Sequence, residues 1–228
     1  MKKVVFVLCA LAMVCSCTFS VNVGNGKKVV CKGPVVEKTL DLTDFNAITV
    51  TGSSDLVIAQ SQNFSVKVNA NEEVFEHIDY TVENGTLNLK TRENVQIVAK
   101  THKVYVTLPC LENLLVNGAA DADIRDYTSD KGLVVLVNGA GDFEVSSVRV
   151  PSLTFTVNGA GDIDATGLDV ETLHVSVNGA GDVDLSGKAG YASLSVSGAG
   201  DIDAQQLECP QIDMHKSGVA SIKTSKKN

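Results

Sequence analysis

The chain has 228 residues, with 19 Lys and Arg against 27 Asp and Glu, a formal net charge of −8, and no tryptophan. A chain this acidic, without a basic stripe interleaved with aromatic residues, is a poor nucleic-acid binder, and we expect no nucleic-acid partner. Its length suffices for one domain with an ample core.

The first residues predict a lipoprotein signal peptide. Lys2 and Lys3 form a basic start, and residues 4–14 form an apolar stretch too short to span a bilayer as a mature helix. Residues 14–17 form a relaxed lipobox, so cleavage after residue 16 would leave Cys17 to carry the lipid. An ordinary secretory peptide cleaved nearby is the alternative.

The lipid would hold the mature chain on a membrane. Thr18 follows Cys17 where an aspartate would favour retention in the inner membrane, so we expect an outer-membrane lipoprotein of a Gram-negative cell. Its orientation, periplasmic or cell-surface facing, is left open. Residues 17–36 are predicted to be a flexible tether, and residues 37–228 one β-helical domain.

A repeat of about 20 residues follows, in the frame Val-Asn-Gly-Ala-Gly-Asp. Its units align on one glycine each: Gly52, Gly118, Gly139, Gly159, Gly179, Gly198 and Gly218. The first gap, 66 residues, is close to three units, so we expect an unbroken ladder of coils.

Two apolar columns with period 2 precede the glycine, and two more follow it. Each unit therefore predicts a strand, a glycine turn, a short strand and a loop. Stacked at ~4.8 Å, such units share one core. The pattern predicts an all-β, right-handed parallel β-helix with rungs of about 20 residues. A β-roll or a β-propeller is the weaker alternative, since a blade needs roughly 40 residues.

The two ends of the solenoid differ from its middle. Residues 64–106 contain a hairpin turn at residues 83–86, which predicts a less regular N-terminal part with antiparallel strands. At the other end four lysines are expected to form a polar cap: Lys216, Lys223, Lys226 and Lys227.

An aspartate stands three positions after the glycine in six of the seven units. The members considered as a speculative metal site are Asp142, Asp162, Asp182 and Asp201. We expect these carboxylates to accept hydrogen bonds from turn amides, and the preceding asparagines to stack as an amide ladder. Ca²⁺ binding is the functional alternative, because hard oxygen ligands suit this ion.

Catalysis is not expected. The carboxylate pairs recur in five successive units, whereas a catalytic site needs one place with distinct environments. His77, His102, His174 and His215 are scattered in the sequence. Cys31, Cys110 and Cys209 are expected to be free, buried thiols, with pairing of Cys31 to another chain as the alternative. A polysaccharide-active β-helix enzyme is the weaker alternative.

Three segments carry a family resemblance: the Asn-Gly-Ala-Gly-Asp-Ile-Asp-Ala repeats, the stretch 45–56 and the hairpin 82–89. They resemble the head GIN domain family, a domain of unknown function described in candidate auto-transporter adhesins. The resemblance implies a β-helical, Bacteroides-type lipoprotein without catalytic residues. The expected function is therefore adhesin-like binding of a protein or glycan partner, with a scaffold role in the envelope as the alternative.

Overall fold

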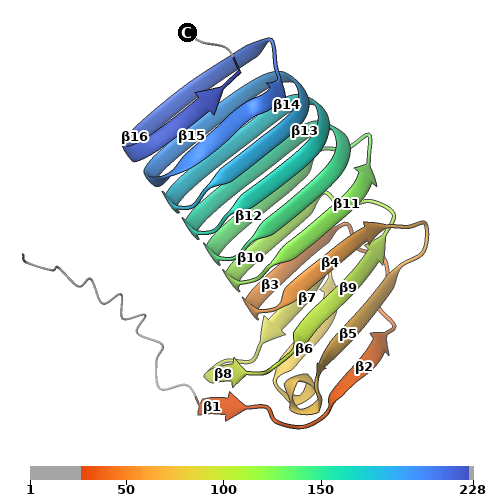
Figure 1. Cartoon of the computed structure of the whole chain (residues 1–228). Helices are drawn as coiled ribbons and strands as arrows, with labels where there is room; N and C mark the ends of the chain where they lie inside the picture. The colour runs from red at the N-terminus through yellow and green to blue at the C-terminus, as the bar shows by residue number, and fades with distance from the viewer. Residues whose placement is uncertain (1–26, 226–228) are drawn as a thin grey trace, which may run out of the picture.

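The computed structural model describes residues 27–225, which form an elongated stack of β-coils with one short 3-10 helix, η1 (Glu72–Glu76), in the described range (Figure 1). The strands of the N-terminal part are β1 (Lys27–Val30), β2 (Val35–Leu40), β3 (Ala47–Ser53), β4 (Asp55–Gln60), β5 (Ser65–Asn71), β6 (Ile78–Glu83), β7 (Thr86–Thr91), β8 (Val95–Val98) and β9 (His102–Leu108). The strands of the C-terminal part are β10 (Asn113–Ala119), β11 (Ala122–Thr128), β12 (Leu133–Ala140), β13 (Phe143–Ala160), β14 (Ile163–Ala180), β15 (Val183–Glu208) and β16 (Gln211–Thr224).

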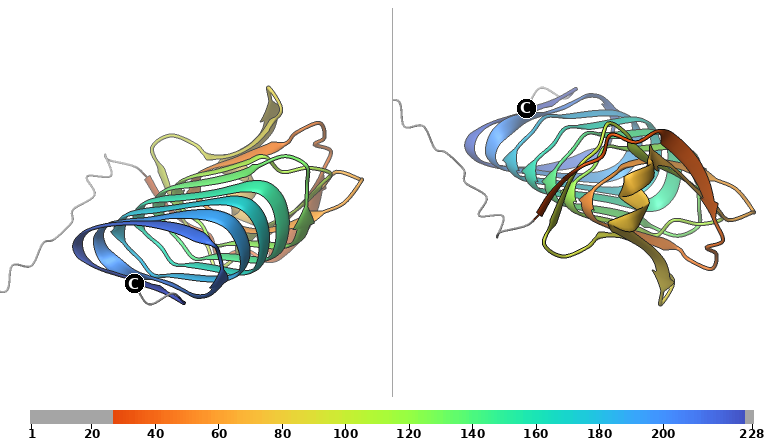
Figure 2. Two further views of the ribbon diagram at one scale, coloured as in Figure 1. Left: turned by 90° about the horizontal axis from the view of Figure 1, so that it is seen from above. Right: turned by 90° about the horizontal axis from the view of Figure 1, so that it is seen from below.

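Each regular coil consists of two strand segments joined by a glycine corner, and like positions of successive coils pair in parallel. Gly118 lies opposite Gly139, which lies opposite Gly159, and the register continues to β16. Figure 2 looks along the stack and shows flattened coils with two broad faces. We call the face formed by segments before the corner (β3, β10, β12 and their successors) the amide face. The face formed by segments after the corner (β4, β11 and their successors) is the acidic face.

The apolar columns predicted from the sequence form one continuous core between these faces. Before the corner, Val137, Val157 and Val177 are at most 1% exposed. After the corner, the side chains of Phe143 and Ile163 are likewise buried. Full burial of each such side chain stabilises the fold by roughly 1.5–3 kcal/mol. The prediction of a β-solenoid with coils of about 20 residues is confirmed.

The corner glycines are required for two reasons. Gly159 has a φ of +147°, a region that L side chains rarely adopt, as the repeat predicted. A Cβ on Gly159 would also lie 2.0 Å from the carbonyl oxygen of Gly139 in the preceding coil. Gly161 lies outside that φ region, yet a Cβ there would lie 2.4 Å from the carbonyl oxygen of Gly141. Close stacking of backbone on backbone therefore excludes a side chain at both positions.

The expectation of an unbroken ladder between Gly52 and Gly118 is wrong. β10 pairs directly with β3, with Gly118 opposite Gly52, so no coil from the intervening segment lies between them. The intervening chain passes to the other edge of these strands, where β7 pairs with β3 and β9 pairs with β4. The order of the coils in space therefore differs from their order in the sequence, because a strand has two edges whose backbone groups need partners.

The N-terminal part contains the antiparallel strands that the sequence predicted. β6 and β7 form a hairpin around Asn84 and Gly85, whose φ angles are +51° and +74°. Two consecutive positive φ angles are typical of a tight two-residue hairpin turn. β5 runs antiparallel to both β2 and β9, and η1 lies across this end of the stack (Figure 2). These elements close the N-terminal end of the core.

Part of the predicted tether is ordered. Of residues 17–36, those from Lys27 onward include β1, which pairs with β8, and the start of β2. The folded domain therefore begins before residue 37. The signal peptide, Cys17 and the first part of the tether lie outside the described residues. Among residues 27–225, no helix has the length and apolar character needed to cross a membrane.

Two polar side chains clamp the ordered part of the tether to the domain. The Glu73 carboxylate accepts hydrogen bonds from the backbone N–H groups of Lys32 and Gly33, at 3.1 and 2.7 Å. The buried Asn71 amide donates to the carbonyl oxygen of Gly33 at 2.7 Å and accepts from the backbone N–H of Lys100 at 2.9 Å. The clamp fixes the direction in which the chain enters the domain.

The C-terminal end carries part of the predicted lysine cap. Lys216 takes the register position that buried Val196 occupies in the preceding coil, and its side chain is exposed. Lys223 follows on the same strand. Charged side chains on an edge strand oppose its pairing with a strand of another chain, so these lysines protect the C-terminal end of the stack. Lys226 and Lys227 lie outside the described residues.

Candidate functional site

The amide face carries the predicted ladder of asparagine side chains. Asn138 donates to Asn117, Asn158 to Asn138, and Asn178 to Asn158, each from Nδ2 to Oδ1 at 2.9 Å. Each inner member of the ladder thus satisfies a donor and an acceptor through its neighbours in the stack. The ladder links the coils and explains the repeated asparagine as architecture.

The first aspartate column of the acidic face is also tied into the stack. Oδ1 of Asp121 accepts from the backbone N–H of Asp142 at 3.0 Å, and Oδ1 of Asp162 accepts from that of Asp182 at 2.8 Å. Asp182 accepts in the same way from the N–H of Asp201, at 3.0 Å. The sequence predicted hydrogen bonds from turn amides, and the structure shows that these amides belong to the following coil.

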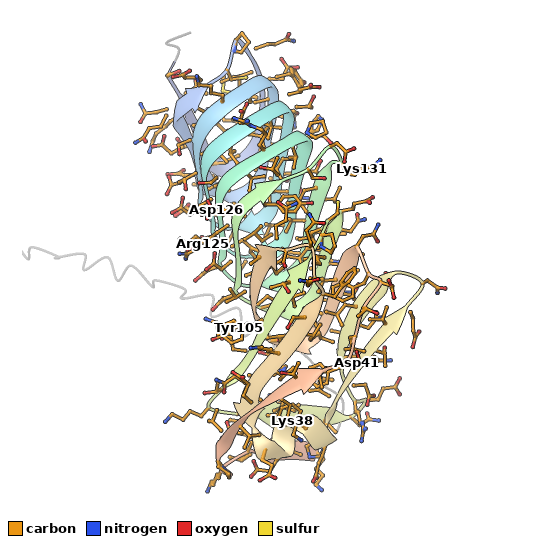
Figure 3. The ribbon with its side chains drawn as sticks, turned by 90° about the vertical axis from the view of Figure 1, so that its right-hand side faces the viewer. Lys38, Asp41, Tyr105, Arg125, Asp126 and Lys131 are labelled. Carbon is orange, nitrogen blue, oxygen red and sulfur yellow. The ribbon has the colours of Figure 1, made fainter. Side chains whose placement is uncertain are left out.

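A second acidic column stands five positions after the corner glycines and lies beside the first. Its members are Asp123, Glu144, Asp164, Asp184 and Asp203. At its N-terminal end Arg125 neutralises two members, with ion pairs of 2.6 Å to Asp123 and 2.8 Å to Glu144. These charge-assisted hydrogen bonds raise the pKa of the Arg125 guanidinium, and the bond to Asp123 contributes most. Figure 3 shows Arg125 and the exposed Tyr105 on the side of the molecule that it presents to the viewer. Further along the stack the outward carboxylates face solvent.

The speculative metal residues Asp142, Asp162, Asp182 and Asp201 lie in one column along the acidic face. The first three line a shallow groove of about 430 Å³ together with Glu144 and Asp164. Among residues 27–225, no group of three or more His, Cys, Asp or Glu side chains is arranged to hold a metal ion. Calcium binding by this column stays the alternative to the structural role, and the hydrogen bonds of Asp162 and Asp182 favour the structural role.

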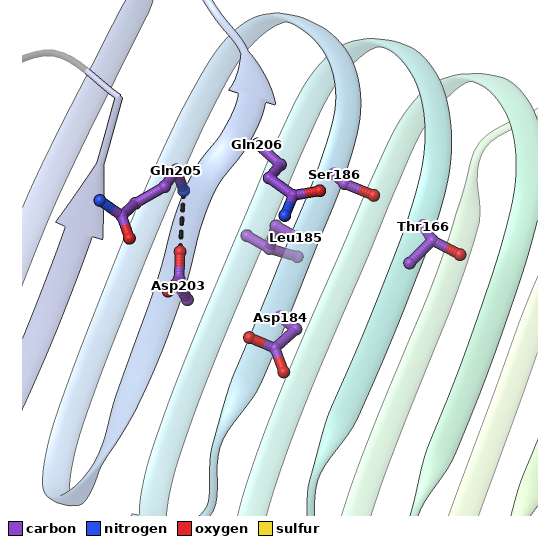
Figure 4. Close-up of a pocket in the computed structure, with 7 residues that line it drawn as sticks. All are labelled: Thr166, Asp184, Leu185, Ser186, Asp203, Gln205 and Gln206. Carbon is purple, nitrogen blue, oxygen red and sulfur yellow. Dashed lines mark hydrogen bonds between the residues drawn. The ribbon is translucent and has the colours of Figure 1, made fainter.

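A second hollow lies where the repeat shortens by one residue. The pairing of Ala165 with Leu185 spans 20 positions, whereas that of Leu168 with Gly187 spans 19, and the register shifts between them. Beside this shift is a hollow of about 340 Å³, shown in Figure 4, whose lining residues are Thr166, Asp184, Leu185, Ser186, Asp203, Gln205 and Gln206. Asp203 accepts a hydrogen bond from the backbone N–H of Gln205 at 2.9 Å. The hollow offers hydrogen-bonding groups and lacks the His or Cys of a nucleophilic site.

His102 is the histidine with the most constrained surroundings. Its Nδ1 lies 2.8 Å from the carbonyl oxygen of Ser53, and its Nε2 lies 2.8 Å from the hydroxyl of Tyr80. Because a carbonyl only accepts, Nδ1 carries the proton and Nε2 accepts from Tyr80. Burial lowers the pKa of His102, and the ring is neutral. It borders a hollow of about 520 Å³ near β8, but both ring nitrogens are committed to the fold.

The cysteines are free thiols within the described chain, as predicted. Cys31 is buried, and burial followed by the nearby Glu73 carboxylate raises the pKa of its thiol. Cys110 lies 3.4 Å from the hydroxyl of Tyr127, and Cys209 donates to the carbonyl oxygen of Gln211 at 3.0 Å. A thiol whose ionisation is disfavoured is a poor nucleophile, so Cys31 serves packing.

The sequence reasoning missed one constellation on the amide face. The hydroxyl of Tyr191 donates to Oδ2 of Asp213 at 2.8 Å, and its ring meets that of His174 edge-on, with centroids 6.1 Å apart. The hydrogen bond to Asp213, ahead of burial, raises the pKa of Tyr191. The signal in the sequence was Tyr191 itself, an aromatic residue whose register neighbours are Thr172 and Gln211.

The sequence from residue 44 to residue 228 matches the model of a family described as "Putative auto-transporter adhesin, head GIN domain". The chain belongs to this family. The resemblance of the repeats to head GIN domains is thereby confirmed. No curated protein matches the chain significantly.

Solved structures of this head GIN protein's relatives share its fold. A putative adhesin from Bacteroides fragilis has a TM-score of 0.72 at 20% identity, over 86% of this chain and 99% of the other. A putative lipid binding protein from Parabacteroides distasonis has a TM-score of 0.78 at 19% identity, over 88% and 98%. A putative adhesin from Parabacteroides merdae has a TM-score of 0.71 at 20% identity, over 86% and 83%. The family and two of these three proteins are described as adhesins, and none as an enzyme.

Proposed function

We propose that this head GIN protein is a lipid-anchored protein of the cell envelope whose solenoid is a non-catalytic, adhesin-like binding domain. Cys17 carries the lipid, and the anchor lies in the outer membrane of a Gram-negative cell. The partner is a protein or a glycan that faces the domain in the periplasm or at the cell surface.

The observation that carries this proposal is the pair of broad faces, each of which presents the same chemical groups coil after coil. Such a surface suits an extended partner that is contacted at many equivalent places, because many weak contacts add up to a stable complex. The adhesin descriptions of the family and of the Bacteroides fragilis protein point in the same direction.

The non-catalytic part of the proposal follows from the repetition. Asp142, Asp162 and Asp182 have equivalent positions in successive coils, and their environments do not set one apart as an acid and another as a base. His102, whose pKa is shifted, uses both ring nitrogens to hold Ser53 and Tyr80. Repetition of this kind supports a surface and gives no support to a polysaccharide-active enzyme.

Lipid binding, named for the Parabacteroides distasonis protein, finds less support in this chain. An acyl chain needs an apolar cavity. The hollow of about 340 Å³ is lined by Asp184, Asp203 and two glutamines among its seven residues, and the groove of about 430 Å³ by six carboxylates and two apolar residues. The hollow of about 520 Å³ near β8 has valine, isoleucine and alanine in its lining, but also the charged Asp55 and Lys100. We therefore assign the lipid to the N-terminal anchor and not to a binding cavity.

Two measurements test the proposal on the full-length protein. Metabolic labelling with an alkyne fatty acid should label the wild type and not the Cys17→Ser variant. The purified lipoprotein in detergent should bind intact bacterial or host cells saturably at physiological salt. Labelling without binding to any cell surface would favour the scaffold role, and absence of labelling would remove the anchor from the proposal.

A further inference from the structure

The repeat of the amide face breaks in the last coils. The asparagine ladder ends at Asn178, whose register neighbour in the next coil is Ser197. In these same coils Tyr191 appears on the outward side, at a position that the two preceding coils fill with Thr172 and Ser152. Asp213 appears where the preceding coil has Ser193. The stacking of the coils explains the side chains that recur from coil to coil. Stacking does not explain this departure from the repeat. The departure is therefore where a binding site is to be sought.

The Tyr191 side chain is held at both ends. Its backbone belongs to β15, and its hydroxyl donates to Asp213 of β16 at 2.8 Å. On its other side the His174 ring packs edge-on at a centroid distance of 6.1 Å and an angle of 67°. A ring fixed before binding loses little conformational entropy when a partner packs on it. Tyrosine combines such a rigid apolar ring with a polar tip, which makes it a frequent anchor of binding sites.

The surroundings of the ring select the kind of partner. Apart from Tyr191, the outward side chains of the amide-face segments 172–178 and 191–197 are hydroxyls, an amide and an imidazole. A protein interface wants an apolar centre with several large side chains, which these segments lack. A polymer rich in hydroxyl groups exchanges hydrogen bonds with serines and threonines, and its C–H faces pack on one aromatic ring. The surface thus favours a glycan over a protein.

Charge narrows the class of glycan. The Asp213 carboxylate lies at one end of the constellation, bonded to the Tyr191 hydroxyl, and the chain as a whole carries a net charge of −8. A negatively charged polysaccharide would be repelled by both. Oδ1 of Asp213 and the imidazole of His174 are suited to bind the hydroxyl groups of a neutral sugar.

We propose that the amide face of the last coils binds a neutral polysaccharide, with the Tyr191 ring as the platform for one sugar unit and Asp213 and His174 as its hydrogen-bonding partners. Neighbouring strands lie ~4.8 Å apart, similar to the length of one sugar unit in an extended chain. A polysaccharide running along the stack places its next units over Thr172 and Ser152, the register neighbours of Tyr191 in the preceding coils. This proposal rests on the binding function proposed above and names its ligand class.

The test measures binding of the full-length lipoprotein in detergent micelles to immobilised α-mannan, β-glucan and xylan, with hyaluronan and alginate as acidic counterparts, at physiological salt. We expect saturable binding to at least one neutral glycan and none to the acidic ones. Tyr191→Ala should weaken that binding roughly tenfold or more, as truncation of an anchoring tyrosine does. Tyr191→Phe keeps the ring and should retain most of the affinity.

The matched control is Tyr105→Ala, which removes an outward tyrosine that is 39% exposed, whereas Tyr191 is half-buried. Tyr105 belongs to β9, which pairs with β4 at the acidic face. Tyr105→Ala should bind like the wild type, and both alanine variants should show the circular dichroism spectrum of the wild type. Equal glycan binding by the wild type and Tyr191→Ala overturns the site and leaves the binding function standing. Binding to a protein on cells and to none of the glycans overturns this inference alone. Binding neither to glycans nor to cells overturns the proposed function as well.

Discussion

The coils from β10 onward and the N-terminal part up to β9 are stabilised in different ways. In the coils a residue meets its own counterpart one repeat away, as Asn158 meets Asn138 at a separation of 20 residues. In the N-terminal part single residues connect unrelated segments, as Asn71 does with Gly33 and Lys100 at separations of 38 and 29 residues. The coils therefore depend on what every unit shares, and the N-terminal part depends on a few polar groups that each occur once.

The largest expected effect tests the shared feature. Gly159→Ala should destabilise the fold by more than about 4 kcal/mol, since the new Cβ meets the backbone of Gly139 and φ is also unfavourable. In the N-terminal part Gly85→Ala should cost only about 1–2 kcal/mol, because φ is positive there but the nearest atom is 3.5 Å away. Urea unfolding of both variants, with exposed Ala160→Ser as the control, measures the difference. Equal losses at the two glycines would mean that backbone stacking is not what excludes the side chain.

The next effect concerns the clamp of the N-terminal part. Asn71→Ala should destabilise the protein by about 1–3 kcal/mol, because the residue is 4% exposed and its loss leaves partly buried backbone groups without their partner. Hydrogen exchange should speed up at Lys100 and Thr101, whose N–H groups now bond to Asn71, before it changes in β13 or β14. Exposed Asn63→Ala is the control. Protection lost evenly over the whole chain would show that the two parts unfold as one unit.

The N-terminal part should also be the more acid-sensitive, through His102. Burial lowers the pKa of the folded imidazole below its ordinary value of 6.5. Above that value the ring is neutral in both states and its contribution to stability is complete. As the pH falls through 6.5 the unfolded chain takes up a proton first, so stability is lost until the folded ring titrates as well. Urea midpoints between about pH 7.5 and about pH 5.5 should therefore fall less in His102→Gln than in the wild type. Parallel curves for the two proteins would contradict this reading of His102.

A smaller effect is expected inside the coils when one rung of the amide ladder is removed. Asn158→Ala breaks the side-chain bonds to Asn138 and Asn178, but the site is exposed and water replaces them. The loss should be about 0.5–1.5 kcal/mol by thermal unfolding. A serine stands at the same place in the coil of Ser197, so Asn158→Ser is the matched comparison. A loss as large as that of Asn71→Ala would mean that water does not replace the ladder's hydrogen bonds at this site.

The smallest effect concerns the acidic face. Millimolar Ca²⁺ against EDTA should leave the unfolding midpoint unchanged, because Asp162 and Asp182 already accept hydrogen bonds from the amides of the following coils. A rise of several degrees, absent in Asp162→Asn, would instead make the aspartate column a metal site.

Much of the fold could be predicted because the same sequence pattern recurs in successive units. The period, the apolar columns and the corner glycines recur in each unit, so the inward and outward sides of the coils were correct from the sequence. The hairpin at Asn84 and Gly85 was predictable from local turn chemistry. The Tyr191 constellation was not, because Asp213 lies 22 residues away and only the register of β15 and β16 brings the two side chains together.

By itself the sequence determined the coil, since periodic apolar side chains and a glycine at each corner allow little else. Only the tertiary structure decided the order of the coils, with β10 against β3 and β7 on the opposite edge, because either edge of a strand can accept a parallel neighbour. It also decided how much of residues 17–36 is folded, since the clamp by Asn71 and Glu73 depends on contacts between segments that are remote in the chain. The local sequence pattern determines the structure of the repeated coils. Contacts that occur only once, between segments remote in the sequence, are determined only when the whole chain packs.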